Sequence, residues 1–336
     1  MERIVDDLKG KGTSQDWCVD ITQKLQDGKR YLKTDFSVHC NEESSPCKDH
    51  CRRFGLSDPS DEDLKGECDH GHHLNCNMCE DLKNVLKDIK QHIIALSPST
   101  CNKEYQEDIL YDFEQAYNNI LQWKAHILRS VNQDKAKHDV IRSLNSNCVL
   151  VIVDWAMKFI QMKYREKQSE WFGKRGISWH VSTVISKQEA SNNVEVQTYV
   201  HLVDQCQQDW FAVCSIFENL LKNVLESKPS IDCIFFRSDE AGCYHNNTLI
   251  VSLRDIATRL GIQVKHYDYS EPSYGKDVCD RIICPMKSSI RCYCNEGHDI
   301  NCAKDMRTAL FERPVKGVTA CVCTLDETEY YKGQQD

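Results

Sequence analysis

The chain has 336 residues, of which 40% are hydrophobic and 28% are charged, with only 14 Gly and 7 Pro. This length is typical of about two domains, and the composition excludes collagen-like and largely disordered proteins. The formal charge of −9 argues against a nucleic-acid partner, because phosphate binding needs a basic surface. However, 11 acidic and 4 basic residues lie between Thr34 and Glu80, so this segment alone carries a net charge of −7. The rest of the chain is therefore nearly neutral, and a basic face there is compatible with the total.

The sequence lacks the signals of membrane insertion and of export. No run approaches the roughly 20 apolar residues of a membrane-spanning helix. Residues 1–12 (MERIVDDLKGKG) lack the apolar core of a signal peptide. We therefore expect a protein of the nucleus or the cytoplasm that is not secreted and has no membrane partner. In these compartments, the 20 Cys are expected to be thiols and metal ligands and not a disulfide framework.

A zinc site is predicted from the first 79 residues, which hold seven of the 20 Cys and five of the 13 His. The pair Cys76-Asn-Met-Cys79 has the spacing that lets two thiolates of one tight turn bind the same tetrahedral ion. Cys68 and either His70 or His72 complete a set of four. Four protein ligands leave no open position, so such a site is structural and not catalytic.

A second group of candidate ligands lies upstream, in Cys47-Lys-Asp-His50-Cys51. It can compete with the first group or build a second site, and spacing does not choose between these two outcomes. The alternative for both groups is free thiols in a polar loop. We disfavour that alternative because free thiols seldom come with so many imidazoles.

Two amphipathic helices are predicted after the zinc candidate. Apolar residues recur at helical spacing from Leu82 to Ile93 and from Ile109 to Val131, on either side of Ser97-Pro98-Ser99. We therefore divide this part of the chain into a zinc-binding N-terminal region with helices, residues 1–100, and a helical linker, residues 101–145.

From residue 146 onward the pattern becomes that of an α/β domain. Cys148–Val153 is a continuous apolar run, typical of a strand buried on both faces, and this strand is predicted to end at Asp154. Two further strands, over 176–185 and 196–203, are predicted to form an antiparallel meander with it.

The second half of this domain is predicted to return to the first strand. A helix over about 207–226 leads to the buried strand Ile231–Phe236, which the right-handed crossover rule makes parallel to the first strand. A helix over 248–260, a strand over 263–269 and a helix beginning near Tyr274 follow. We therefore predict an α/β core over residues 146–312, with a mixed five-stranded sheet and flanking helices, and a tail over 313–336.

Acidic residues follow both buried strands. In open α/β sheets, sites form beyond the carboxyl ends of parallel strands, where Asp154 and Asp239 would come within metal-bridging distance. Asp280, in the first turns of the last helix, could reach across to this pair, with Asp277 as its rival. The alternative is that each residue is only a helix or turn cap, so the prediction depends on their combination.

This arrangement resembles the ribonuclease-H-like catalytic core of DDE/D transposases and retroviral-type integrases. Val153-Asp154-Trp155, Arg237-Ser238-Asp239-Glu240 and the run from Tyr274-Gly275-Lys276 to Asp280 look like segments of transposon-derived proteins. Such proteins also carry an upstream Cys-x-His-x-His-x-x-x-Cys-x-x-Cys cluster, which residues 68–79 match.

The resemblance implies a transposase-like enzyme that cuts and joins DNA strands. Two Mg²⁺ or Mn²⁺ ions would be held by Asp154, Asp239 and Asp280, since hard divalent ions prefer carboxylate oxygens. The implied partner is DNA, in particular transposon ends, and the resemblance allows for a homo-oligomer. The alternative is a domesticated or degenerate transposase that acts as a non-catalytic nucleic-acid- or protein-binding protein. An α/β hydrolase is disfavoured because Gly-x-Ser-x-Gly is absent.

A path for DNA is predicted directly after the first strand. Six basic and two acidic residues lie between Lys158 and Arg175, interleaved with aromatic residues, as backbone neutralisation and base stacking require. Lys174, Arg175 and Lys276 are the predicted phosphate contacts. The alternative is a solvated loop whose aromatic side chains turn into the core.

Overall fold

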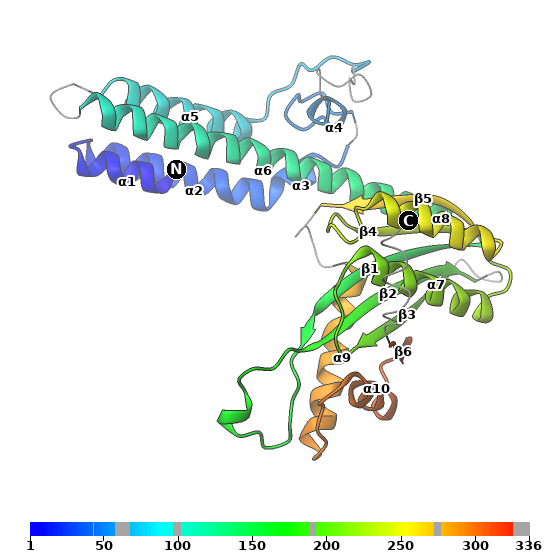
Figure 1. Ribbon diagram of the computed structural model, residues 1–336. Coiled ribbons are helices and arrows are strands. Elements are labelled where there is room, and N and C mark those ends of the chain that lie inside the picture. The colour runs from blue at the N-terminus through cyan, green and yellow to red at the C-terminus, as the bar shows by residue number, and fades with distance from the viewer. Residues whose placement is uncertain (43, 58–67, 97–101, 189–192, 272–276, 325–336) are drawn as a thin grey trace. The chain divides into compact units, whose positions relative to one another are not determined.

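The computed structural model describes residues 1–336 except 43, 58–67, 97–101, 189–192, 272–276 and 325–336. The chain forms two compact units, residues 1–135 and 136–336 (Figure 1). No helix in the described ranges combines the length and the apolar character needed to cross a membrane.

The first unit is helical. Its elements are α1 (Glu2–Gly10), α2 (Gln15–Lys33), α3 (Asp35–His39), α4 (Arg52–Gly55), α5 (Asn77–Ile94) and most of α6 (Lys103–Ser143). Helices α1, α2, α3, α5 and α6 share one apolar core. The predicted periodic segments lie in α5 and α6, and the buried residues of α6 at Ile109, Phe113 and Ile127 belong to this core. Most of the predicted linker, residues 101–145, is therefore part of the packed helical unit.

The second unit is built on a six-stranded mixed sheet. Its strands are β1 (Cys148–Phe159), β2 (Ile177–Lys187), β3 (Val194–Val203), β4 (Cys233–Asp239), β5 (Gln263–Ser270) and β6 (Val318–Val322), in the order β5-β4-β1-β2-β3-β6. Strands β1 to β3 form an antiparallel meander, while β4 is parallel to β1 and to β5. This is the ribonuclease-H-like arrangement, so the predicted fold class is confirmed. The helices are α7 (Trp210–Ser227), α8 (Asn247–Arg259), α9 (Val278–Asn295) and α10 (Ala303–Glu312).

The sixth strand was not predicted. β6 pairs with β3 in parallel, inside the segment expected to be a tail. The amide of Thr198 donates to the carbonyl of Gly317 over 2.7 Å, and Gly317 has a φ of +73°, a backbone conformation that favours glycine. This turn brings a short, half-buried strand onto the edge of the sheet.

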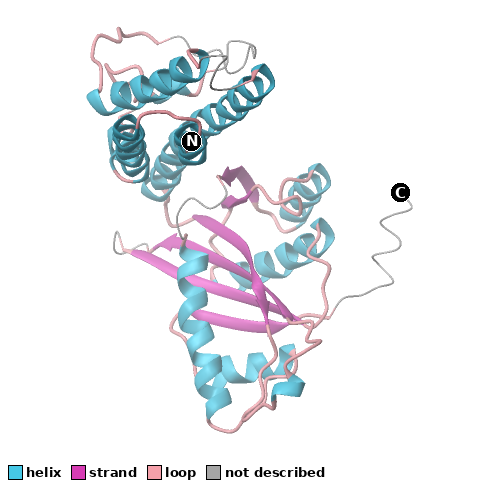
Figure 2. Cartoon of the chain, turned by 90° about the vertical axis from the view of Figure 1, so that its left-hand side faces the viewer, coloured by secondary structure: helices cyan, strands magenta, loops and turns pink. Residues whose placement is uncertain are grey.

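The two faces of the sheet carry different helices (Figures 1 and 2). Val149, Val151 and Val153 of β1 pack with α7 and α8 in one core. Leu150 and Ile152 pack with α9 and α10 in the other. Because side chains alternate along a strand, Asp154 shares the α9 face with Leu150 and Ile152.

The predicted end of the first strand is wrong. β1 continues beyond Asp154 to Phe159, and Asp154, Trp155 and Ala156 pair with β2. The physical reason is that the antiparallel pairing of β1 with β2 extends further along β1 than its parallel pairing with β4. The last parallel pair is Ile152 with Arg237. Asp154 therefore lies within a strand, at the position where its parallel neighbour is ending.

Candidate metal centres and nucleic-acid interface

Two aspartates occupy equivalent positions on neighbouring strands. Ile152 of β1 lies opposite Arg237 of β4 in the parallel pair, and two residues further along each strand come Asp154 and Asp239. Phe235 of β4 packs with the core on the α9 side, so Asp239, four residues later, lies on the same face as Asp154. Both side chains are partly buried.

The third aspartate comes from α9. The Sγ atom of Cys279 donates to the carbonyl oxygen of Ile152 over 3.2 Å, which holds the first turn of α9 against β1, two residues before Asp154. Asp280 follows directly and is exposed. Its rival Asp277 is the N-cap of α9, accepts from the amide of Val278 over 2.7 Å, and lies 3.5 Å from Nζ of Lys137. Asp277 is therefore engaged in capping the helix, which favours Asp280 as the third ligand.

The electrostatics link these carboxylates. Burial, followed by the negative charges of Asp239, Asp280 and Asp277, raises the pKa of Asp154 from 3.8 to about 7. Ionising Asp154 is unfavourable because its side chain is largely desolvated and because other carboxylates repel its charge. A divalent cation bound at this position would offset both costs. Carboxylate oxygens are also the ligands that Mg²⁺ and Mn²⁺ prefer, so the donor set fits these ions.

The carboxylates are less tightly gathered than the Cys and His ligand candidates. In the described ranges, the groups of three or more donor atoms that all lie within 4.8 Å of one another are two Cys/His groups, and Asp154, Asp239 and Asp280 do not form such a group.

The predicted phosphate contacts have different surroundings. Lys174 is 11% exposed, pairs with Glu166, donates to the carbonyl of Gln161 over 2.7 Å, and lies over the ring of Trp171. The positive charge of Lys174 is therefore already neutralised by Glu166 within the loop. Arg175 is exposed. Lys276 lies outside the described residues.

Aromatic side chains of the loop after β1 face solvent. Trp171 is 57% exposed and Phe172 is 76% exposed, whereas Phe159 at the end of β1 is buried. The alternative of aromatics turned into the core therefore applies to Phe159 and not to Trp171 or Phe172. Exposed rings beside basic side chains can stack on unpaired bases.

The first Cys/His group contains Cys51, Cys68, His70 and His72. The Sγ atom of Cys51 lies 3.7 Å from Sγ of Cys68 and 3.6 Å from Nε2 of His70. Nδ1 of His70 lies 3.2 Å from Oδ1 of Asp69, the kind of outer contact that orients a metal-binding imidazole. Two thiols and two imidazoles fit a tetrahedral zinc ion.

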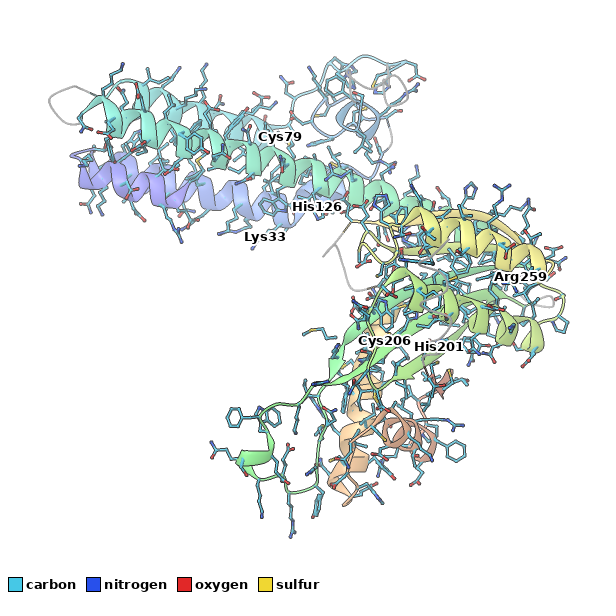
Figure 3. All side chains as sticks on the ribbon, in the orientation of Figure 1. Lys33, Cys79, His126, His201, Cys206 and Arg259 are labelled. Carbon is cyan, nitrogen blue, oxygen red and sulfur yellow. The ribbon has the colours of Figure 1, made fainter. Side chains whose placement is uncertain are left out.

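The predicted zinc ligands are divided between two places. Cys68, His70 and His72 are in the first group, but Cys76 and Cys79 lie at the start of α5, where Sγ of Cys79 is 3.6 Å from Nε2 of His50. Figure 3 labels Cys79 in the helical unit. The amide of Leu74 donates to the carbonyl of Pro46 over 3.1 Å, which fixes the chain between the two places. A single site made of Cys68, Cys76 and Cys79 with one His is therefore not what the structure assembles.

Three members of these groups lie outside the set predicted from residues 68–79; two of them, His50 and Cys51, belong to the predicted upstream group, and only His39 was missed. Cys51 belongs to the first, and His39 and His50 belong to the second. The run from Cys47 to Cys51 was the available signal for two of them, whereas His39, at the end of α3, carries no spacing motif.

Comparison with known proteins identifies a family. The family model described as "Domain of unknown function (DUF8701)" matches residues 133–335. The chain belongs to this family. Among curated proteins, no relative matches the chain.

Two solved structures that match part of the chain are of the Human cytomegalovirus terminase nuclease domain. The first is 11% identical with a TM-score of 0.24, over 56% of this chain and 73% of that chain. The second, Mn soaked and inhibitor bound, is 12% identical with a TM-score of 0.23, over 60% of this chain and 84% of that chain.

Proposed function

We propose that this DUF8701 protein is a metal-dependent enzyme that cleaves and joins DNA strands, with Asp154, Asp239 and Asp280 as its metal ligands. The observation that carries the proposal is the equal register of Asp154 and Asp239 on parallel strands, on the face that α9 covers. A pair of Mg²⁺ or Mn²⁺ ions held by these three carboxylates would supply the positive charge that activates an attacking water or 3′ hydroxyl and stabilises the leaving oxygen.

The protein residues would supply charge and position. Asp154 and Asp239 lie on strands that are hydrogen-bonded into the sheet. The hydrogen bond of Cys279 to Ile152 holds the first turn of α9, and with it the next residue, Asp280, against β1. The raised pKa of Asp154 supports a role in cation binding, because a cation would favour its ionised form.

The loop over 160–176 would guide the DNA. Arg175 would neutralise a phosphate, while Trp171 and Phe172 would stack on bases of a distorted or single-stranded end. More specifically, we propose that the reaction is transposase-like strand transfer at transposon ends, in the nucleus. A homo-oligomer would hold the two ends. The resemblance of the acidic segments supports this form.

The test is metal-dependent nicking of DNA that carries candidate element ends. Wild type should nick with Mg²⁺ or Mn²⁺, whereas Asp154→Asn and Asp239→Asn should bind DNA without nicking it. Asp232→Asn is the matched control, because Asp232 is exposed and lies just before the opposite end of β4. Nicking that persists in both Asn variants would show that other residues hold the metal.

The second candidate function is non-catalytic binding of nucleic acid or protein. The pairing of Lys174 with Glu166 favours it, because one predicted phosphate contact is already neutralised within the protein. A binding protein of this kind would gain no thermal stability from Mn²⁺, whereas a two-metal enzyme would, because ions that bind only the folded state stabilise it.

A further inference from the structure

A buried tyrosine hydroxyl in the helical unit is surrounded by metal-type ligands. The hydroxyl of Tyr31, on α2, lies 3.2 Å from Nδ1 of His39 and 3.0 Å from Nε2 of His50. It also lies 3.4 Å from Sγ of Cys76 and 3.4 Å from Sγ of Cys79. Tyr31 itself is among the most deeply buried large side chains of the described ranges.

Hydrogen bonding to Tyr31 does not account for this gathering. A hydroxyl has one proton to donate and two lone pairs, so it cannot satisfy two imidazoles and two thiols together. The ligand atoms also lie close to each other. Those of His39, His50 and Cys76 are all within 4.8 Å of one another, and Sγ of Cys79 is 3.6 Å from Nε2 of His50. An ion bound by His39, His50 and Cys76 would account for this gathering, and Cys79 is the fourth ligand within reach, through its position beside His50.

We propose that His39, His50, Cys76 and Cys79 bind a second zinc ion, separate from the one that suits Cys51, Cys68, His70 and His72. Two thiolates balance the charge of the ion, and two imidazoles complete a closed tetrahedral set of the Cys₂His₂ kind. Tyr31 is not counted among the four ligands; its hydroxyl lies 3.4 Å from Sγ of Cys76 and 3.4 Å from Sγ of Cys79, and would donate its proton to one of these thiolates.

The two sites are nested along the chain. His39 and His50 come first, residues 51–72 supply the whole inner site, and Cys76 and Cys79 close the outer one. The adjacent residues His50 and Cys51 therefore serve different ions. The outer ion joins the end of α3 to the start of α5, whereas the inner ion closes the loop around α4.

The segment that carries His50 is held in place independently of any ion. The carboxylate of Asp49 lies 2.7 Å from Nζ of Lys83 on α5 and 2.5 Å from Nζ of Lys124 on α6. This clamp presents His50 to the start of α5, where Cys76 is the N-cap and Cys79 lies in the first turn. Contacts with two helices, α5 and α6, therefore preorganise the outer site.

The decisive measurement is the number of zinc ions per chain. We would purify the full chain from zinc-supplemented cells without chelator and count ions by native mass spectrometry and by elemental analysis. The wild type should hold two. A wild type that holds one ion or none overturns the proposal, whatever the variants do.

Single variants then assign the ligands. Cys76→Ser should hold one ion and lose the outer one, and Cys51→Ser should hold one ion and lose the inner one. Cys18→Ser is the matched control, because Cys18 is a buried thiol of α2 whose contact is the carbonyl of Val5, and it should keep two. Cys40→Ser should also keep two, and loss of an ion there would overturn the proposed ligand set.

Tyr31→Phe distinguishes a zinc site from a metal-free pocket in which the hydroxyl is the central hydrogen-bonding group. This test does not depend on the folding of a variant that lacks a ligand. If the outer site binds zinc, the Phe variant keeps two ions, and Co²⁺ substitution gives the absorption of two tetrahedral thiolate sites. If the hydroxyl is instead the centre of a metal-free pocket, the wild type holds one ion and Tyr31→Phe lowers the thermal midpoint without changing the count. The second result overturns the proposal.

Discussion

Replacing Asp154 by Asn should stabilise the metal-free protein at neutral and alkaline pH. The pKa of Asp154 is raised from 3.8 to about 7, first by burial and then by the charges of Asp239 and Asp280. A carboxyl group whose pKa is higher in the folded state favours folding while it is protonated. This contribution is complete at low pH and is lost as the pH rises through about 7.

The size of the effect follows from the two pKa values. At about 1.4 kcal/mol per pKa unit, the difference between 3.8 and about 7 corresponds to roughly 4 kcal/mol of lost stability at pH 8. Asn cannot ionise, so the variant avoids this loss. The same linkage predicts that the advantage of the variant grows by about 2 kcal/mol between pH 5.5 and pH 8.

The assay is urea unfolding at several pH values in buffer with no added metal and no chelator, so that the proposed zinc sites of the helical unit are not stripped. Hydrogen exchange at the amides of β1 and β2 reports the second unit separately. Asp232→Asn is the control and should show no such pH dependence. Adding Mn²⁺ at pH 8 should stabilise the wild type and not Asp154→Asn. A stability difference between wild type and variant that is the same at pH 5.5 and pH 8 would refute this account of the site.

Four further predictions concern the loop after β1. Arg175→Ala should weaken binding to all DNA sequences and reduce the slope of log K against log[salt] by about 0.9, as binding titrations at several salt concentrations would show. Lys174→Ala should leave this slope unchanged. It should instead lower the free energy of unfolding by about 2 kcal/mol, because Glu166 loses its partner, and urea unfolding would show this. Trp171→Ala should lower affinity for single-stranded DNA by about 1 to 3 kcal/mol with little loss of stability, and the reverse pattern would indicate a packing role. Gly176→Ala should destabilise the second unit by about 1 to 2 kcal/mol, because φ is +75° and a Cβ atom would lie 2.9 Å from Cβ of Lys158; an unchanged unfolding midpoint would contradict this.

Local sequence patterns were sufficient for most of the second unit. Continuous apolar runs mark β1 and β4 because these strands are buried on both faces, and period-3.6 apolar residues mark α7 and α8. The handedness of crossovers then makes β1 and β4 parallel, so the placement of Asp154 and Asp239 on neighbouring strands follows from the amino-acid sequence alone.

Local patterns were not sufficient where an element is short or lies at an edge. β6 has five residues, is only half-buried, and pairs with β3 more than a hundred residues earlier in the chain, so its existence depends on a partner that its own sequence does not specify. The length of β1 beyond Asp154 likewise depends on β2, which continues the ladder.

By itself, the sequence determined which residue types are present for metal chemistry, because thiols, imidazoles and carboxylates in dense runs are visible without a fold. Only the tertiary structure decided which of them meet. Spacing limits how far two ligands can be apart, but it does not choose among partners that long-range packing brings together. The contact of Leu74 with Pro46 thus separates Cys68 from Cys76, and the capping bond of Asp277 favours Asp280 as the carboxylate that α9 offers to a metal ion.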